Sequence, residues 1–250
     1  MYADETEMLR LGFPVLETAR GSPPSLSMTA WSGDESASIR ENPRCRLLEV
    51  RKLRILPRAF YARDPRRVAR ELLGKIVVRR RGRKRLAGRV VEVEAYLGAG
   101  DAAAHAAAGL TPRNRVLFGE PGRAYVYFIY GNHYCLNVSC LPAGQAGCVL
   151  IRALEPVEGL REMARARQVA LAGGAGLRRL CSGPGRLCEA FGITRPRDNG
   201  KNLASGRSDL AIYDDGFRPR RIAVTKRIGI RKAAGMSLRY VVAQSEFVSR

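Results

Sequence analysis

Histidine is scarce in this chain, and its cysteines are not arranged as metal ligands. The 250 residues include two histidines, His105 and His133, and six cysteines that form no CxxC pair. Zinc sites use cysteine and histidine at short, regular spacings. The sequence therefore predicts no metal site, and it indicates no other cofactor. Cysteines without such spacing are typical of reduced, buried thiols.

Long apolar runs are missing as well. No stretch approaches the roughly 20 apolar residues that a membrane-spanning helix needs. The N-terminus also lacks a basic start followed by an apolar run, the pattern of a secretory signal. We expect a monomer without membrane association, located in the cytoplasm with the bacterial nucleoid or, in a eukaryote, in the nucleus.

Lysine is rare, although the chain is strongly basic. Only six of the 44 basic residues are lysines, so the other 38 are arginines, and the formal net charge is +21. A surplus of this size favours a polyanionic partner such as double-stranded DNA. An Arg-rich composition that reflects only the codon bias of a genome is the alternative.

The first part of the chain differs from the rest. Residues 1–40 hold three arginines and six acidic residues, together with many Ser, Pro and Gly. Such a segment, without a sustained hydrophobic period, is typical of disorder. We expect a disordered extension over residues 1–45 and a folded catalytic domain over residues 46–250.

The remaining sequence predicts an α+β fold with a mixed sheet and peripheral helices. The expected elements are a helix that Asp64 caps, a hairpin that turns near Gly82, a hairpin over 123–139, a strand over 148–155, a helix over 159–171, a break at 173–176, a short helix after a glycine-rich turn at 182–185, and strands within 220–242. We find no internal repeat.

The segment from Gly88 to Gly98 holds several residues of types that can act in catalysis. With period 2, Val91, Val93, Ala95 and Leu97 fall on one face of a strand, and Glu92, Glu94 and Tyr96 fall on the other. The glycines that follow end the strand, which places the carboxylates close to a turn that a substrate can reach. On this pattern alone the two glutamates are equal candidates for a catalytic base, and a surface carboxylate is the simpler interpretation of either.

The second hairpin has an unusual tip. A Gly131–Asn132 turn between two β-rich runs predicts a tight hairpin. Tyr130 stands at this tip beside His133 and Tyr134. Exposed aromatic groups at a tip are either shielded by another loop or inserted into a partner.

The succession of motifs resembles the alkyladenine (3-methyladenine) DNA glycosylase family of the non-helix-hairpin-helix type. From about Leu53 onward the motifs are ARELLGKIVVRR, GRVVEVEAYLG, DAAAH, TPRNR, YVYFIYGNHYCLNVS, CVLIRALEP, LCSGPGRLCEAFGI and KRIGI. The resemblance implies a single mixed domain with a curved, mostly antiparallel sheet and a protruding hairpin that inserts into DNA. It also implies a monofunctional enzyme of base excision repair, which flips alkylated or deaminated purines out of duplex DNA and hydrolyses the N-glycosidic bond, leaving an abasic site.

The resemblance assigns roles to individual residues. Glu94 matches the general base, and Tyr96, His105 and Tyr127 match the residues that sandwich the flipped purine. Asn137 matches the pocket residue that crowds the 2-amino group of normal guanine. Four residues match DNA contacts: Tyr130, which fills the gap in the duplex, Arg152 near a phosphate, and the Ser182–Gly183 turn.

Departures and alternatives remain. The turn between His105 and Thr111 is shorter than in vertebrate members, and Asn132 and His133 are more polar than usual at the tip, which puts the preference among lesions in doubt. A nucleic-acid-binding protein without catalysis is one alternative. A bifunctional glycosylase/lyase is the other, but it needs an amine for a Schiff base, and the chain has no lysine between Lys84 and Lys201.

Overall fold

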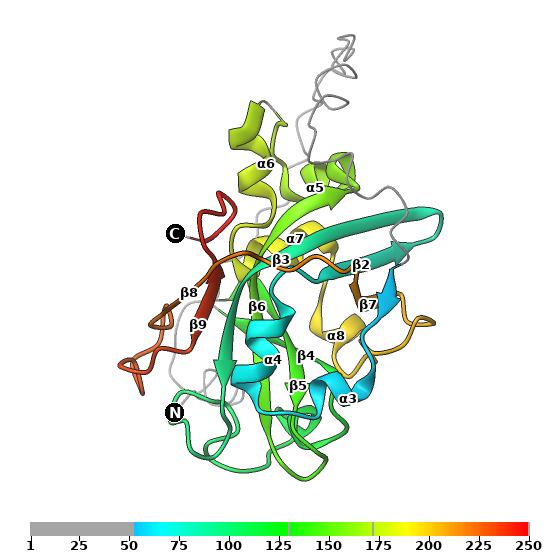
Figure 1. Cartoon of the computed structure of the whole chain (residues 1–250). Helices are drawn as coiled ribbons and strands as arrows, with labels where there is room; N and C mark the ends of the chain where they lie inside the picture. Colours follow the sequence, from blue (N-terminus) through cyan, green and yellow to red (C-terminus); the bar gives the residue numbers. More distant parts are fainter. Residues whose placement is uncertain (1–52, 130, 172, 250) are drawn as a thin grey trace, which may run out of the picture. The chain divides into compact units, whose positions relative to one another are not determined.

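One long strand, β3 (Lys84–Tyr96), organises the sheet (Figure 1). Its first half pairs with β2 (Ile76–Arg81), and its residues Glu92–Glu94 pair with β9 (Arg239–Val242). On the other side, β6 (Gly147–Glu158) accompanies β3 over most of its length. The end of β3 that carries Glu92, Glu94 and Tyr96 is therefore enclosed by strands from distant parts of the chain.

The computed structural model describes residues 53–129, 131–171 and 173–249, which belong to one compact unit, Glu41–Arg250. The strand order is β1-β7-β2-β3-β6-β5-β4, with β9 on β3 and β8 on β9, and all these pairings are antiparallel. This confirms the predicted α+β class. The remaining strands are β1 (Arg54–Ile55), β4 (Ala124–Ile129), β5 (His133–Cys140), β7 (Leu210–Asp214) and β8 (Ile222–Thr225). The extension predicted over residues 1–45 and the tip residue Tyr130 lie outside the described residues.

Short helices surround the sheet. They are α3 (Arg58–Tyr61), α4 (Pro65–Leu72), the 3-10 helix η2 (Arg115–Phe118), α5 (Leu160–Arg167), α6 (Gly173–Cys181), α7 (Pro184–Phe191) and α8 (Arg195–Asp198). The predicted cap of α4 is confirmed, because the Asp64 carboxylate accepts a hydrogen bond from the N–H of Arg66 at 2.8 Å. Across the described ranges, no helix has the length and apolar character to cross a membrane.

The break predicted at residues 173–176 is wrong, because these residues form the first turn of α6. Gly176 serves close packing instead. A Cβ atom on Gly176 would lie 2.5 Å from the carbonyl oxygen of Ala170, so the helix approaches the preceding backbone more closely than any side chain permits.

The alternation predicted for β3 is partly wrong. Val93 and Ala95 lie in the main core and Leu97 packs against it, but Val91 packs with Ala153 and Phe247 in a separate cluster. The pairing of β3 with β6 is irregular on both sides of Glu92. A register irregularity of this kind redirects side chains locally, and here it moves Val91 to a different cluster.

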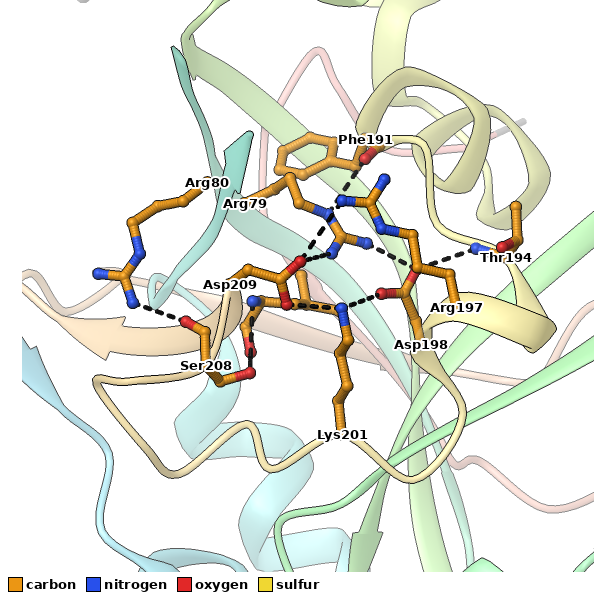
Figure 2. Close-up of polar contacts among 10 residues, drawn as sticks. Arg79, Arg80, Phe191, Thr194, Arg197, Asp198, Lys201, Ser208 and Asp209 are labelled. Carbon is orange, nitrogen blue, oxygen red and sulfur yellow. Dashed lines mark hydrogen bonds and ion pairs between the residues drawn. The ribbon is translucent and has the colours of Figure 1, made fainter. Parts of the chain in front are cut away.

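A buried ion network lies where β2, β7 and α8 meet (Figure 2). Arg79 is fully buried, and its guanidinium donates to Asp198 at 2.6 Å and to Asp209 at 3.0 Å. Lys201 contacts both carboxylates, and the N–H of Thr194 donates to Asp198 at 3.0 Å. A charge without contact to water needs such compensation, so this network fixes α8 to the sheet.

We predict that Asp198→Asn lowers the free energy of unfolding by about 3 kcal/mol, because removal of one partner leaves a buried charge with less compensation. Denaturant titration measures the loss. Glu71→Gln is the matched control, since Glu71 forms a half-exposed ion pair with Arg63 at 2.8 Å. Such pairs contribute less than about 1 kcal/mol, so equal losses in the two variants would contradict the prediction.

Candidate active site

A cavity of about 630 Å³ opens between the end of β3, the β4–β5 hairpin and the start of α7. Its walls hold seven of the nine residues that the sequence singled out: Tyr96, His105, Tyr127, Asn137, Arg152, Ser182 and Gly183. Glu94 lies directly behind the wall, in contact with three lining residues. Tyr130 is outside the described residues, so its expected role stays a prediction.

Glu94 is fully buried, so the simpler interpretation of it as a surface carboxylate is wrong. One carboxylate oxygen accepts a hydrogen bond from the N–H of Ile228 at 2.8 Å and lies 3.3 Å from the Arg152 guanidinium. The other accepts from the Tyr96 hydroxyl at 3.0 Å. Burial raises the pKa of Glu94, while Arg152 and these two donors partly oppose the rise. A carboxylate with a raised pKa is a stronger proton acceptor than an ordinary one.

Glu92 is also fully buried, but it is more heavily bonded. It accepts hydrogen bonds from Arg152 at 3.0 Å and Arg239 at 2.7 Å. The backbone N–H and the hydroxyl of Ser249 donate to it at 2.6 and 2.8 Å. With two guanidinium groups and two further donors around it, this carboxylate is poorly suited to take a proton from a substrate. The geometry therefore separates two glutamates that the strand pattern alone left equal, and it agrees with the resemblance, which favoured Glu94.

Arg152 joins the two carboxylates. Its guanidinium contacts Glu92 through Nε and Glu94 through a terminal nitrogen, and the side chain is mostly buried in the cavity wall. Between two negative groups, a guanidinium compensates both charges at once.

Aromatic rings form the apolar part of the cavity. The ring centroids of His105 and Tyr127 lie 4.5 Å apart, and Tyr125 packs 5.9 Å from His105 and 5.6 Å from Tyr127. Burial raises the pKa of Tyr125 to about 12. Its hydroxyl and Nδ1 of His105 share a hydrogen bond of 2.9 Å, which fixes the imidazole in the cavity wall.

Asn137 has a fixed amide. Its Nδ2 donates to the carbonyl of Tyr125 at 3.1 Å, and its Oδ1 lies 3.8 Å from the thiol of Cys148. The side chain is buried and lines the cavity, so it presents a rigid obstacle to whatever enters.

The Ser182–Gly183 turn leads into α7. Gly183 has a φ of +143°, a conformation that favours glycine, and it precedes Pro184 at the first helical position. A Cβ atom on Gly185 would lie 2.8 Å from the His133 ring. The tip end of the β4–β5 hairpin therefore rests directly on the start of this helix.

Several contributors were not found from the sequence. Ile228 and Arg227 belong to the KRIGI motif, and Asp101 belongs to the DAAAH motif. The sequence therefore marked these residues as parts of family motifs but gave them no individual role. Ser249 and Arg239 carried no recognisable pattern, because they lie 157 and 147 positions from Glu92, which they contact only in the folded chain.

An aromatic cavity backed by a buried carboxylate is the candidate active site of this chain. Comparison with known proteins agrees. The methylpurine-DNA glycosylase family matches residues 59–246. A protein of Koribacter versatilis, provisionally named a 3-methyladenine DNA glycosylase, is 64% identical over 194 residues, which cover 78% of this chain and 92% of that protein.

Similarly named proteins of Burkholderia cenocepacia and Methanocella arvoryzae are 47% identical over 196 residues and 45% identical over 185 residues. They cover 78% and 74% of this chain, and 91% and 89% of their own lengths. The chain belongs to the methylpurine-DNA glycosylase family. It is a hydrolytic DNA glycosylase, and DNA is its substrate.

His105 provides a test of the cavity's environment. Burial lowers the pKa of His105, and the positive charge of Arg113 acts in the same direction. We predict that the imidazole titrates below the ordinary histidine value of about 6.5 and is neutral at pH 7. NMR titration measures this directly, because a His133→Gln variant leaves one histidine signal. A pKa at or above the ordinary value would contradict the buried position.

Proposed function

We propose that this chain is a monofunctional glycosylase of base excision repair. Its substrates would be 3-methyladenine, 7-methylguanine, hypoxanthine and ethenoadenine in duplex DNA. The observation that supports this most directly is the position of Glu94, buried behind Tyr96 at an aromatic cavity. A base in the stack cannot reach such a group, so the nucleotide must be flipped out.

The ring distances restrict how a purine is held. A ring stacked between two others needs about 7 Å between them, twice the normal contact distance. The 4.5 Å between His105 and Tyr127 is too small for this. We infer that these two rings form one wall together and that the purine stacks between them and Tyr96.

Glu94 has the environment of a general base. Hydrolysis breaks the bond between C1′ of the sugar and the purine nitrogen, and positive charge develops on the sugar. An ionised Glu94 would stabilise that charge and take a proton from the attacking water. The hydroxyl then bonds to C1′, the C1′–N bond breaks, and its electron pair leaves with the purine. Cationic 3-methyladenine and 7-methylguanine leave as neutral bases, whereas hypoxanthine and ethenoadenine leave as anions that take a proton from solvent. An abasic site and a free base result.

Arg152 and the Ser182–Gly183 turn are suited to hold the nucleotide's phosphate. A guanidinium has five N–H groups, so Arg152 can bond Glu92 and Glu94 and still donate to a phosphate oxygen. Backbone N–H groups at a turn that leads into a helix favour an anion as well. Both groups line the same cavity.

Asn137 is suited to exclude normal guanine. Because both ends of its amide are engaged, it cannot turn away from a 2-amino group. Rejection would come from this clash, whereas hypoxanthine and adenine derivatives lack the group.

The two alternatives have less support. A binding protein without catalysis does not explain two buried carboxylates at a cavity. A lyase needs an amine, and no lysine lines the cavity in the part of the chain that the structure describes. Hydrolysis by water is the better match.

The decisive experiment compares Glu94→Gln with Glu92→Gln on duplexes that contain hypoxanthine, ethenoadenine or 7-methylguanine. Alkali converts abasic sites into strand breaks. We expect Glu94→Gln to lose on the order of 10²-fold or more in excision rate and to keep lesion binding, because the change removes a base but little volume.

Glu92→Gln should retain measurable excision and lose thermal stability, since Arg152 and Arg239 lose a shared counter-ion. Glu158→Gln is the control on the neighbouring strand, where the half-exposed carboxylate pairs with Arg85 at 2.7 Å. Retained excision in Glu94→Gln together with loss in Glu92→Gln would transfer the role to Glu92. No excision by the parent protein would reject the proposed function.

The pH dependence gives a second test. A base must be deprotonated to act, and burial raises the pKa of Glu94 above its ordinary value. We therefore predict that the single-turnover rate falls as the pH drops through a pKa above about 4.5. A rate that stays constant down to that pH would contradict the assignment of Glu94.

A further inference from the structure

The ion pair between Arg227 and Asp101 is buried beside the active site, and neither residue has a role in the reaction proposed above. Arg227 donates two hydrogen bonds to Asp101, at 2.5 and 2.8 Å, and both side chains have no exposed surface. The two residues come from segments that are 126 positions apart. Each segment carries part of the cavity wall.

Asp101 shapes the loop that follows β3. Besides the guanidinium, its carboxylate accepts hydrogen bonds from the N–H groups of Leu97 at 3.2 Å and Ala103 at 3.1 Å. These bonds fix the turn that leads from β3 to Ala103 and His105, both of which line the cavity.

Arg227 contacts the Tyr96 ring and the backbone of the strand that carries it. Its Cζ lies 4.6 Å from the centroid of the Tyr96 ring, and one terminal nitrogen donates to the carbonyl of Ala95 at 3.1 Å. A guanidinium over a ring attracts it electrostatically and holds it in place. The next residue, Ile228, donates its N–H to Glu94, so the position of Arg227 also determines the position of that donor.

We propose that Asp101 and Arg227 are positioning residues of the glycosylase reaction, which hold the Tyr96 ring and the Ile228 N–H in the places that base stacking and Glu94 require. The inference rests on the proposed function of Glu94 and Tyr96. Neither residue lines the cavity, so both act through others.

The structure offers a matched control for such a pair. Arg79 and Asp198 are equally buried and bonded at 2.6 Å (Figure 2), but no residue of their network lines the cavity. A buried pair that serves only stability should behave like this one. A positioning pair should also affect the reaction.

The test compares Arg227→Lys and Asp101→Asn with Asp198→Asn. Lysine keeps the charge of Arg227 but cannot hold both oxygens of Asp101, the carbonyl of Ala95 and the Tyr96 ring face together. We expect both site variants to excise hypoxanthine about 10- to 100-fold more slowly, the size of effect that small misplacement of reacting groups produces.

The pH profile distinguishes positioning from a loss of folded protein. The Ile228 N–H lowers the pKa of Glu94, so loss of this bond raises it. The acidic limb of the rate profile should therefore move to higher pH in both site variants. Fluorescence quenching of ethenoadenine duplex, which needs no excision, should weaken because Tyr96 is displaced, whereas binding of undamaged duplex should stay at the parent level.

Asp198→Asn should lower the melting temperature and keep the parent rate, acidic limb and quenching, with all measurements made well below either melting temperature. Site variants that melt lower but keep these three properties would overturn the inference and make the pair purely structural. An active parent with unchanged site variants rejects this inference alone, whereas an inactive parent rejects the proposed function. Asp101→Asn leaves Arg227 in place, so it keeps the test available if Arg227→Lys does not fold.

Discussion

The cost of burying Glu92 and Glu94 is the constraint on which this site depends. Two carboxylates on one strand, both without contact to water, repel each other and lose their hydration. Arg152 lies between them and compensates both. Glu92 also receives Arg239 and Ser249. Burial raises the pKa of Glu94, and Arg152, the Ile228 N–H and the Tyr96 hydroxyl oppose this rise only in part.

The contacts that compensate these buried charges join distant parts of the chain. Ser249 and Glu92 are 157 positions apart, and Arg227 and Asp101 are 126 apart. Each contact brings a loop or terminal segment to the last residues of β3, where pairing with β6 and β9 already limits movement. A reacting group needs this support, because small displacements of it reduce rates strongly.

The same kind of interaction serves a different purpose at the other end of the sheet. The network of Arg79, Asp198 and Asp209 fixes α8 beside β2 and β7, and none of its residues lines the cavity. Its chemistry resembles that of the Asp101–Arg227 pair: a fully buried arginine bound by carboxylates. What differs is the neighbour, since only Arg227 contacts an aromatic wall and precedes a donor to Glu94.

The sequence by itself determined the local features. The Asp64 cap, the hairpin at Gly131–Asn132 and the shared side of Glu92, Glu94 and Tyr96 depend on turn chemistry and period 2, which act over a few residues. The motif order indicated the family and most of the cavity's walls. Only the tertiary structure decided that Val91 leaves the main core, that glycines 173–176 begin a helix, and that Glu94 receives fewer donors than Glu92. Burial, register and charge pairing depend on residues that meet only after folding, and no local pattern encodes them.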